Sequence, residues 1–471
     1  MNFFDLFDKS NFLLDVKSEE GFAFIFHKRM EQLDHLKNKD KNIGVLSRVG
    51  VFLYNIISRF SLCKSNLKKT DYVLYSGTKN QYDSLFGSFA ELIKNSSVLN
   101  VLDGRWLKVS NENEQYIKFT PMIAVLSLFL FFYRSLSLYK RLKAEGLSDS
   151  ISLYFDRFCS VYYYVPFFLD LLTTVQPKFV LMSNDHSPAN RSLLFVAKSL
   201  GIKTVYMQHA SVSNLFPKLE FDYSFLDGVN AYAIYKEVDL LDRTENLTVF
   251  SEKHVFLTGQ KKNVIKNNVK HAGSDYACGV GFSHLDSNDF IMKVVESLLG
   301  VFAQCYLRFH PSHPIESVSI IKNHFFSNSS VLFSAGKDEL LKDFLEPVSI
   351  FFGSGTSLHL EVALSGVRCF YIENSDIKNN DYYSYERTGL VIPINIDDVT
   401  LAYFSDLGLE QSENEMRAVK KYSATYNTEW FGSEGKLVVS ILKDIEDSLS
   451  LNVPLSIDYM HKDFNSNMWS V

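Results

Sequence analysis

The sequence predicts an α/β protein in which two doubly wound halves face a central cleft. Its 471 residues are too many for one ordinary hydrophobic core. Residues 178–210 contain an apolar strand, an amphipathic helix and a second apolar strand in turn, and a similar alternation restarts near residue 275. Strands that alternate with helices are typical of a parallel sheet covered by helices on both faces.

The composition is that of a globular protein. Hydrophobic residues make up 46% of the chain, charged residues make up 22%, and the formal net charge is −6. We therefore expect no nucleic-acid partner. The cysteines have neither the spacing of a zinc site nor that of a disulfide framework, which fits a reducing cytoplasm. They are Cys63, Cys159, Cys278, Cys305 and Cys369.

In the first half, the clearest helix spans 188–201. It has proline near its start and glycine at its end, which is the usual placement of these residues. An apolar run precedes it and another follows it, so the three segments predict a strand–helix–strand unit. The expected strands span 71–77, 97–103, 178–185 and 203–210, and the expected helices span 81–95, 121–175 and 188–201.

A final strand of the first half is expected from residue 254, and it runs into a basic, Asn-rich linker at 260–275, after which the alternation restarts. The predicted domains are 1–265, with helical additions, and 275–405. A helical tail at 406–471 follows them, and its packing against the first domain is left open. The later expected strands span 276–282, 303–310, 330–336, 348–353 and 368–373, and the helices span 288–300, 314–325, 338–345, 356–366 and 434–449.

Residues 121–143 combine about a dozen apolar residues with a basic end, so they fall short of the ~18–20 needed to span a bilayer. Two interpretations remain open. The segment is a buried helix with a solvated basic end, or it lies in a membrane interface with its cations toward anionic lipid. Residues 45–64 form a second basic amphipathic segment. The acidic N-terminus lacks the pattern of a signal peptide.

Ligands of open α/β sheets bind beyond the carboxyl ends of the strands, and three polar stretches fall there. The first is "FFGSGTSLHLEVALSG", residues 351–366, where an apolar strand breaks into small residues and becomes a helix. Glycines allow close backbone approach, and hydroxyls with helix N–H groups suit a phosphate. A plain helix cap is the alternative. The candidates are Gly353, Ser354, Gly355, Thr356 and Ser357.

The second stretch is "LRFHPSHP", residues 307–314. His310 leaves an apolar strand, Arg308 lies two residues earlier on the same strand face, and Pro311 ends the strand. A cation and an imidazole at a strand end can stabilise a departing phosphate. For His313 we expect a structural role.

The third stretch joins the ends of two neighbouring strands. Asp185 and His186 end one, and Gln208 and His209 end the next. A carboxylate beside a histidine suits general-base catalysis on an acceptor hydroxyl, so His209 and Asp185 are the candidates. Capping of the following helix is the alternative role for Asp185.

The chain contains no D-x-D pair, no G-x-G-x-x-G after a strand, no Walker A sequence and no G-x-S-x-G. We therefore expect neither a metal ion nor a nicotinamide cofactor.

"GSGTSLHLEVALSGVRCFYIE" resembles the nucleotide-binding strand–loop–helix of GT-B glycosyltransferases. This resemblance implies two Rossmann-like domains, the first binding an acceptor and the second a nucleotide donor. It also implies that Glu361 holds the ribose, and that hydroxyls of the loop hold the donor phosphate.

With "RFHP", "DHSPANRSLLFVAKSLGIKTVYMQHAS" and "FDYSFLDG", the resemblance extends over residues 175–440. It is to bacterial capsule and lipopolysaccharide Kdo- or sialyltransferases that carry an HP motif, and more distantly to CDP-glycerol glycerophosphotransferases. The latter have a WHGT-like sequence where this chain has "QHAS". Many sialyltransferases have paired serines where this chain has Gly355, Thr356 and Ser357.

The resemblance implies a metal-independent glycosyltransferase that moves a CMP-activated sialic acid or Kdo to a lipopolysaccharide, O-antigen or capsule glycan. A CDP-glycerol or ribitol transferase, a nucleotide-sugar 2-epimerase and a catalytically silent scaffold remain alternatives. We expect a cytoplasmic protein, with peripheral contact at the inner membrane left open. The expected catalytic residues are His209, Asp185 and His310, and the expected nucleotide site comprises Arg308, His310, Gly353, Ser354, Gly355, Thr356, Ser357 and Glu361.

Overall fold

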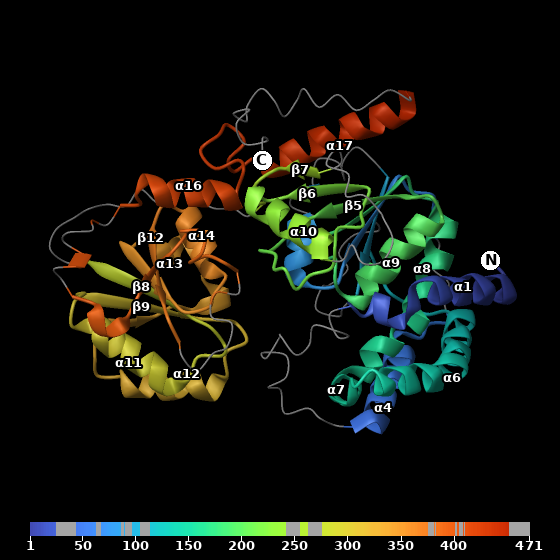
Figure 1. The fold of residues 1–471 in the computed structure, drawn as a ribbon, viewed down its shortest axis with the longest axis horizontal. Coiled ribbons are helices and arrows are strands. Elements are labelled where there is room, and N and C mark those ends of the chain that lie inside the picture. Colours follow the sequence, from blue (N-terminus) through green and yellow to red (C-terminus); the bar gives the residue numbers. More distant parts are fainter. Residues whose placement is uncertain are drawn as a thin grey trace.

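A computed structural model shows how the chain folds (Figure 1). It describes residues 1–24, 44–62, 67–85, 89, 97–103, 114–241, 255–261, 276–374, 381, 383–400, 403–404, 408 and 410–451. Several predictions fall outside these residues: most of the expected linker, much of the helix expected at 81–95, Cys63, and residues 452–471 of the expected tail.

The N-terminal domain is built on a seven-stranded sheet with the order β3-β2-β1-β4-β5-β6-β7. Every strand pair is parallel. The central strands are buried along their whole length, as expected of a parallel sheet with both faces covered. The strands are β1 (Tyr72–Ser76), β2 (Val98–Leu102), β3 (Glu114–Tyr116), β4 (Phe179–Met182), β5 (Lys203–Met207), β6 (Tyr223–Leu226) and β7 (Val255–Leu257).

Helices cover this sheet, and α1, α4, α6 and α7 lie together in a layer beside α8 (Figure 1). Helix α6 begins after Thr120, whose hydroxyl accepts a bond from the amide of Ile123, and Pro121 occupies the first helical position. The helices are α1 (Phe3–Phe22), α4 (Gly44–Arg59), α6 (Pro121–Ala144), α7 (Ser148–Cys159), α8 (Val161–Val175), α9 (Pro188–Ser199) and α10 (Val229–Leu241).

The C-terminal domain has a six-stranded parallel sheet with the order β10-β9-β8-β11-β12-β13. The strands are β8 (Ala277–Phe282), β9 (Gln304–Phe309), β10 (Val331–Phe333), β11 (Ile350–Gly353), β12 (Arg368–Ile372) and β13 (Ile392–Ile394). The helices are α11 (Asn288–Leu299), α12 (Ile315–His324), α13 (Leu341–Leu345) and α14 (Leu358–Leu364), with short 3₁₀ turns at Gly336–Asp338 and Ile396–Asp398.

In both sheets the strand that comes first in the chain, β1 or β8, lies inside the sheet. Later strands are added on one side of it and then on the other, so each domain is doubly wound and Rossmann-like. The predicted fold class is therefore confirmed. The reversal creates a crevice at the carboxyl ends of the strands, which is where such sheets bind ligands.

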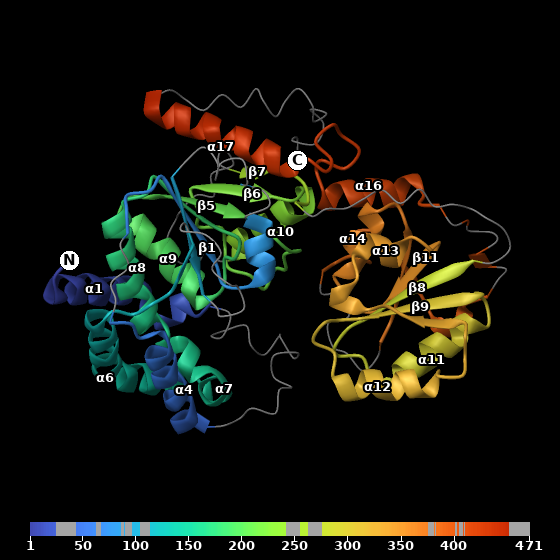
Figure 2. The ribbon, with the colours of Figure 1, turned by 180° about the vertical axis from the view of Figure 1, so that it is seen from behind.

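The last two helices join the domains. Helix α16 (Glu413–Tyr422) packs in the core of the C-terminal domain, whereas α17 (Glu434–Leu451) packs on the N-terminal sheet through Leu437 and Leu442. Figure 2 shows α16 beside the C-terminal domain and α17 lying across the N-terminal domain. Between these helices the amide of Ala424 donates to the Asp227 carbonyl at 2.8 Å. The chain thus crosses back to the domain in which it began.

Candidate functional site

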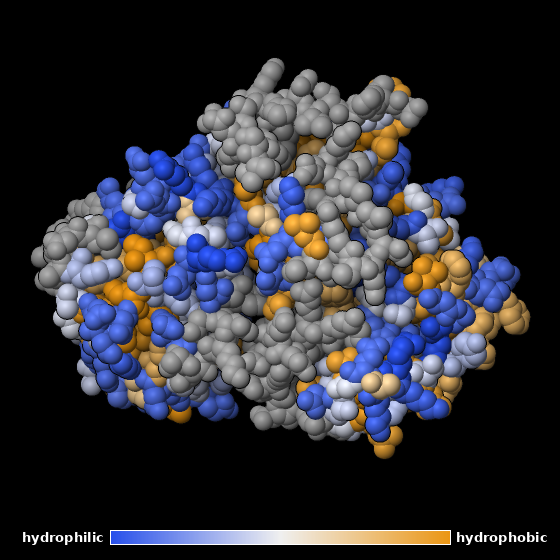
Figure 3. Space-filling model, viewed as in Figure 1, coloured by the Kyte–Doolittle hydropathy of each residue, from blue (hydrophilic) through white to orange (hydrophobic). Residues whose placement is uncertain are grey.

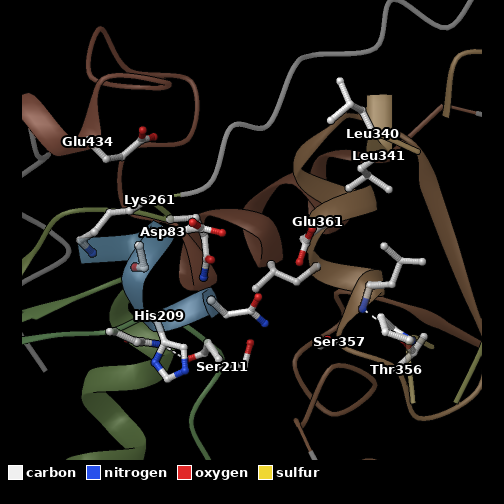
Figure 4. A pocket seen from close by; sticks show the side chains of 18 of the residues that line it. Asp83, His209, Ser211, Lys261, Leu340, Leu341, Thr356, Ser357, Glu361 and Glu434 are labelled. Atoms are coloured by element: carbon white, nitrogen blue, oxygen red, sulfur yellow. Dashed lines mark hydrogen bonds between the residues drawn. The ribbon is translucent and has the colours of Figure 1, made fainter. Parts of the chain in front are cut away.

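A cleft of about 1050 Å³ separates the two domains. Its walls include the loop after β5, the end of β9, the turn between β11 and α14, and the start of α17. In Figure 4, His209 and Ser211 lie on one side, opposite Thr356, Ser357 and Glu361. The predicted site residues that line the cleft are His209, Arg308, His310, Thr356, Ser357 and Glu361.

The turn between β11 and α14 is tightly built. A β-carbon on Gly353 would lie 3.1 Å from the Gly281 carbonyl oxygen and 3.0 Å from Nε2 of His359, so only glycine fits without displacement. Thr356 Oγ1 accepts from the amide of Leu358 at 3.3 Å. Ser357 stands at the N-cap, yet its exposed side chain makes no capping bond in the described chain. Its hydroxyl is thus available to a ligand, as are the N–H groups in the first turn of α14 that follow the engaged amide of Leu358.

Ser354 lies beneath this turn and does not line the cleft. Its side chain is 2% exposed, and its hydroxyl donates to Oδ2 of Asp286 at 2.7 Å. Asp286 also accepts from the Ser283 amide at 2.7 Å and from Nδ2 of Asn374 at 2.9 Å. Burial raises the pKa of Asp286. One carboxylate therefore ties together the segments that follow β8, β11 and β12. Gly353 and Gly355 are likewise not among the lining residues.

His359 supports the turn from below. It is fully buried, and its Nε2 lies 3.1 Å from the Ser354 carbonyl oxygen, so the nitrogen must be the donor. Burial lowers the pKa of His359 to about 4. The ring is therefore neutral at physiological pH and acts as a fixed hydrogen-bond donor.

His310 lies directly after β9, on the rim of the cleft. Its Nδ1 accepts a hydrogen bond from the amide of Ser312 at 3.1 Å. In the neutral ring the proton is therefore on Nε2, which makes this atom a donor. The ring of His284 lies 5.1 Å from that of His310.

Arg308 lines the cleft but is largely engaged within its own domain. One guanidinium nitrogen donates to Ser334 Oγ at 2.9 Å and to Glu339 Oε2 at 3.1 Å, and the other donates to the Glu339 carbonyl. The guanidinium also lies over the Phe344 ring. Burial lowers the pKa of Arg308 from its usual value. Glu339 thus offsets part of the positive charge offered to a ligand, and a phosphate there would compete with it.

His313 does not reach the cleft lining. Its ring is buried, with Nδ1 2.9 Å from the Ser283 carbonyl oxygen and Nε2 2.9 Å from Ser317 Oγ. Burial lowers its pKa. This arrangement is structural, as expected.

Asp185 lies away from the cleft lining and is 2% exposed. It accepts from the Tyr235 hydroxyl at 2.6 Å and pairs with Nδ1 of His186 at 2.8 Å. The capping role considered for Asp185 is wrong. Ser187 is the N-cap of α9, and its hydroxyl accepts from the amide of Asn190.

His209 lies on the cleft wall, at the end of β5 (Figure 4). The buried side chain of Gln208 accepts from the Asp227 amide at 2.9 Å and donates to the Ala210 carbonyl at 2.9 Å. These bonds fix the turn that carries His209. Two residues further on, the Ser211 hydroxyl lies 2.9 Å from that of Tyr385, so this loop also contacts the C-terminal domain.

Lys261 and Glu434 are among the charged cleft residues that no sequence pattern identifies. The side chain of Lys261 is 2% exposed, and its Nζ lies 3.4 Å from Asp227 Oδ1. Glu434 accepts from the Thr425 hydroxyl at 3.0 Å and from the Gly432 amide at 2.9 Å. Burial lowers the pKa of Lys261 and raises that of Glu434. They come from the end of the first domain and the start of α17, which only the fold brings together.

No three His, Cys, Asp or Glu side chains of the described residues are grouped so that they could hold a metal ion.

Two Rossmann-like domains whose strand ends face one cleft define a protein with GT-B architecture. No family model and no curated protein matches the chain. Solved structures similar to it include the lipopolysaccharide outer core galactosyltransferase WaaB, with 10% identity over 78% of this chain and 98% of that one, and a TM-score of 0.44.

The wall teichoic acid polymerase TagF is 11% identical, over 89% of this chain and 98% of that one, with a TM-score of 0.45. A UDP-N-acetylglucosamine 2-epimerase is 11% identical, over 80% and 96%, with a TM-score of 0.46. The two parallel sheets define the fold.

Proposed function

We propose that this protein is a metal-independent glycosyltransferase that adds a nucleotide-activated sugar to a bacterial surface glycan. The observation that carries the proposal is the placement of His209 across one cleft from His310, Ser357 and Glu361. A candidate proton acceptor thus faces candidate ligands of a nucleotide phosphate. The preferred donor is CMP-sialic acid or CMP-Kdo, and the preferred acceptor is a lipopolysaccharide, O-antigen or capsule glycan.

The donor would bind to the C-terminal domain. The Ser357 hydroxyl, the N–H groups of α14 that follow Leu358 and the Nε2–H of His310 are suitable donors to phosphate oxygens. Arg308 would add positive charge at the same wall. Glu361 lies one turn into α14 and lines the cleft, where its carboxylate can accept from ribose hydroxyls.

His209 is the better candidate for the base, because it lines the cleft whereas Asp185 does not. Both carboxylate oxygens of Asp185 accept hydrogen bonds inside the domain. We therefore propose that Asp185 orders the end of β4 and that His209 takes the acceptor proton.

In the proposed reaction, an acceptor hydroxyl attacks the anomeric carbon while the bond from that carbon to the phosphate oxygen breaks. The proton of the hydroxyl moves to His209. The electron pair of the broken bond remains on the phosphate, where His310, Arg308 and the turn before α14 stabilise the added charge. No cofactor beyond the nucleotide-linked co-substrate is required.

The proposed location is the cytoplasm, with peripheral contact at the cytoplasmic face of the inner membrane. The four cysteines of the described residues are free and buried, which fits a reducing compartment.

A thermal-shift panel with CMP, CDP, UDP and GDP tests the donor. A nucleotide that binds only the native state raises the unfolding midpoint. We expect the midpoint to rise with CMP or CDP, and His310→Ala to weaken this response more than His284→Ala. A rise with UDP or GDP alone would contradict the cytidine donor. No rise with any nucleotide would contradict the donor site and favour a silent scaffold.

The product separates the remaining enzymatic alternatives. Transfer from a CDP-polyol leaves a phosphate in the product, whereas transfer of a sugar does not. Turnover of the nucleotide-sugar without an acceptor would identify an epimerase instead.

A further inference from the structure

Helix α6 presents an apolar stripe to solvent. Its members are between 50% and 73% exposed, and their spacing of four, three, one and three residues places them on one face of the helix. They are Val125, Phe129, Phe132, Tyr133 and Leu136, called here the α6 stripe. Large exposed apolar side chains are ordinary when isolated, but a continuous row of them indicates a contact surface.

The opposite face of α6 is fixed in the core of the domain. Leu126, Leu130, Leu138 and Leu142 are fully buried there. Beside the stripe, the ring of Phe7 from α1 makes edge contacts with Phe129 at 5.2 Å and Tyr133 at 6.2 Å. The stripe is therefore held rigidly and does not need to fold when it binds.

The two arginines of α6 are paired with acidic residues of α1. Arg134 turns to α1, where it pairs with Asp15 at 2.6 Å and with Glu19 at 2.7 Å, and Arg141 pairs with Glu19 and Glu20.

Lys140 and Lys143 continue the exposed face of α6 beyond Leu136. The outward surface of the helix thus changes from aromatic and aliphatic to cationic along its length.

By length and composition alone, two helical stretches of the described chain could cross a membrane, and α6 (Pro121–Ala144) is one of them, so the expectation that 121–143 is too short to span a bilayer is wrong. The most apolar part of α6 is 39% buried, whereas that of Ser148–Val175 is 89% buried and belongs to the core. Crossing a bilayer would require α6 to leave that core and would expose the ion pairs of Arg134 to hydrocarbon. A position parallel to the membrane surface needs neither change.

We propose that the α6 stripe lies in the interface of an anionic lipid bilayer, with the helix parallel to the membrane plane. Phenylalanine and leucine suit the acyl boundary, and tyrosine suits the headgroup level. Lys140 and Lys143 then meet anionic headgroups, a charge complementarity that an uncharged protein groove would not provide. Figure 3 shows apolar side chains on the surface near the N-terminus, at the outer end of this helical layer. The inference does not depend on the proposed reaction.

Co-sedimentation of the full chain with vesicles tests the proposal. We expect binding to vesicles of phosphatidylcholine mixed with phosphatidylglycerol, weaker binding to pure phosphatidylcholine, and loss of the difference at high salt. The double variant Phe132→Ser/Leu136→Ser should bind about tenfold or more weakly, since apolar area no longer enters the interface. Lys140→Glu/Lys143→Glu should abolish the preference for the anionic vesicles.

Phe326→Ser is the matched control, since Phe326 is 89% exposed on the C-terminal domain and should not affect vesicle binding. Thermal midpoints with and without nucleotide show that each variant is folded, independently of lipid. Absence of binding by the unchanged protein, or equal binding by the stripe variant, would overturn the proposal. So would a dimer in light scattering that Phe132→Ser/Leu136→Ser dissociates while vesicles remain unbound, because a second copy would then be the occupant.

Discussion

Oδ2 of Asp286 accepts a hydrogen bond from the hydroxyl of Ser354 at 2.7 Å and thereby joins two loops that are 68 residues apart in sequence. The same carboxylate holds the Ser283 amide and Nδ2 of Asn374. The turn before α14 therefore rests on an acid that does not touch the cleft.

Asp286→Ala should lower both stability and nucleotide affinity. It leaves three buried donors without their acceptor, and each such donor costs about 1–3 kcal/mol. Asp286→Asn should cost less, because its amide oxygen still accepts a bond. Urea unfolding measures the first effect and nucleotide titration the second. Unchanged midpoints and affinity in Asp286→Ala would show that the turn does not depend on this carboxylate.

His310→Ala should reduce turnover by about 10²–10³-fold, the usual effect of losing one preorganised donor at a developing charge. The side chain is on the rim, so the fold should remain intact. His284→Ala, whose ring lies 5.1 Å away, is the control and should retain most activity. Release of the nucleotide measures turnover, and circular dichroism monitors the fold. Near-normal activity in His310→Ala would refute its phosphate role.

His209→Ala should reduce turnover without weakening nucleotide binding, unlike His310→Ala, which should weaken both. If His209 acts on the acceptor, the variant loses turnover but keeps the nucleotide-induced rise in the thermal midpoint. The activity that remains in the variant should also no longer fall at acidic pH, because the group that must be deprotonated is absent. Rate–pH profiles of the two proteins measure this. A variant that retains full turnover would exclude His209 as the base.

The fold was largely predictable because buried parallel strands are continuous apolar runs. The expected strands at 178–185 and 203–210 contain β4 (Phe179–Met182) and β5 (Lys203–Met207). The sequence did not predict β6 (Tyr223–Leu226), a buried strand of only four residues. It also did not predict β3 (Glu114–Tyr116) and β13 (Ile392–Ile394), which are short edge strands with exposed or polar residues. Such edges lack the hydrophobic pattern on which the prediction depends.

The site was only partly predictable for a different reason. Strand ends place His209 and His310 at the cleft, so their approximate position follows from local pattern. Within the turn before α14, however, Ser354 points inward and Ser357 outward. The inward orientation of Ser354 depends on its hydrogen bond to Asp286, a distant residue that no local sequence pattern identifies. Lys261 and Glu434 were missed because only the return of α17 brings them to one cleft.

His359 should make stability depend on pH. Its pKa is lowered from 6.5 to about 4 in the folded protein, so the unfolded chain binds more protons between these values. The stabilisation is fully present above pH 6.5 and is lost as the pH falls toward 4, by about 3 kcal/mol in total.

Urea unfolding across this range measures the effect. His359→Gln can still donate to Ser354 and does not titrate, so its stability should change less with pH. His324→Gln alters an exposed histidine and serves as the control. A pH dependence that persists unchanged in His359→Gln would contradict the assignment.

Gly259→Ala should disrupt the joint between the domains. Gly259 has φ = +77°, and a β-carbon there would lie 1.8 Å from Oγ1 of Thr425, in the segment that returns from α16. The substitution would displace Thr425, whose hydroxyl donates to Glu434 at the start of α17. Two costs therefore add: positive-φ strain of about 1–2 kcal/mol and a steric clash of about 1–3 kcal/mol.

Gly146→Ala separates the two costs. Gly146 has φ = +80°, but nothing lies within 4 Å of its would-be β-carbon, so only the strain applies. Urea unfolding should show a clearly larger loss for Gly259→Ala, and the nucleotide response should weaken only in that variant, since Glu434 borders the cleft. Equal losses in the two variants would mean that Thr425 moves aside at little cost, and that the crossing after α16 does not hold the domains together.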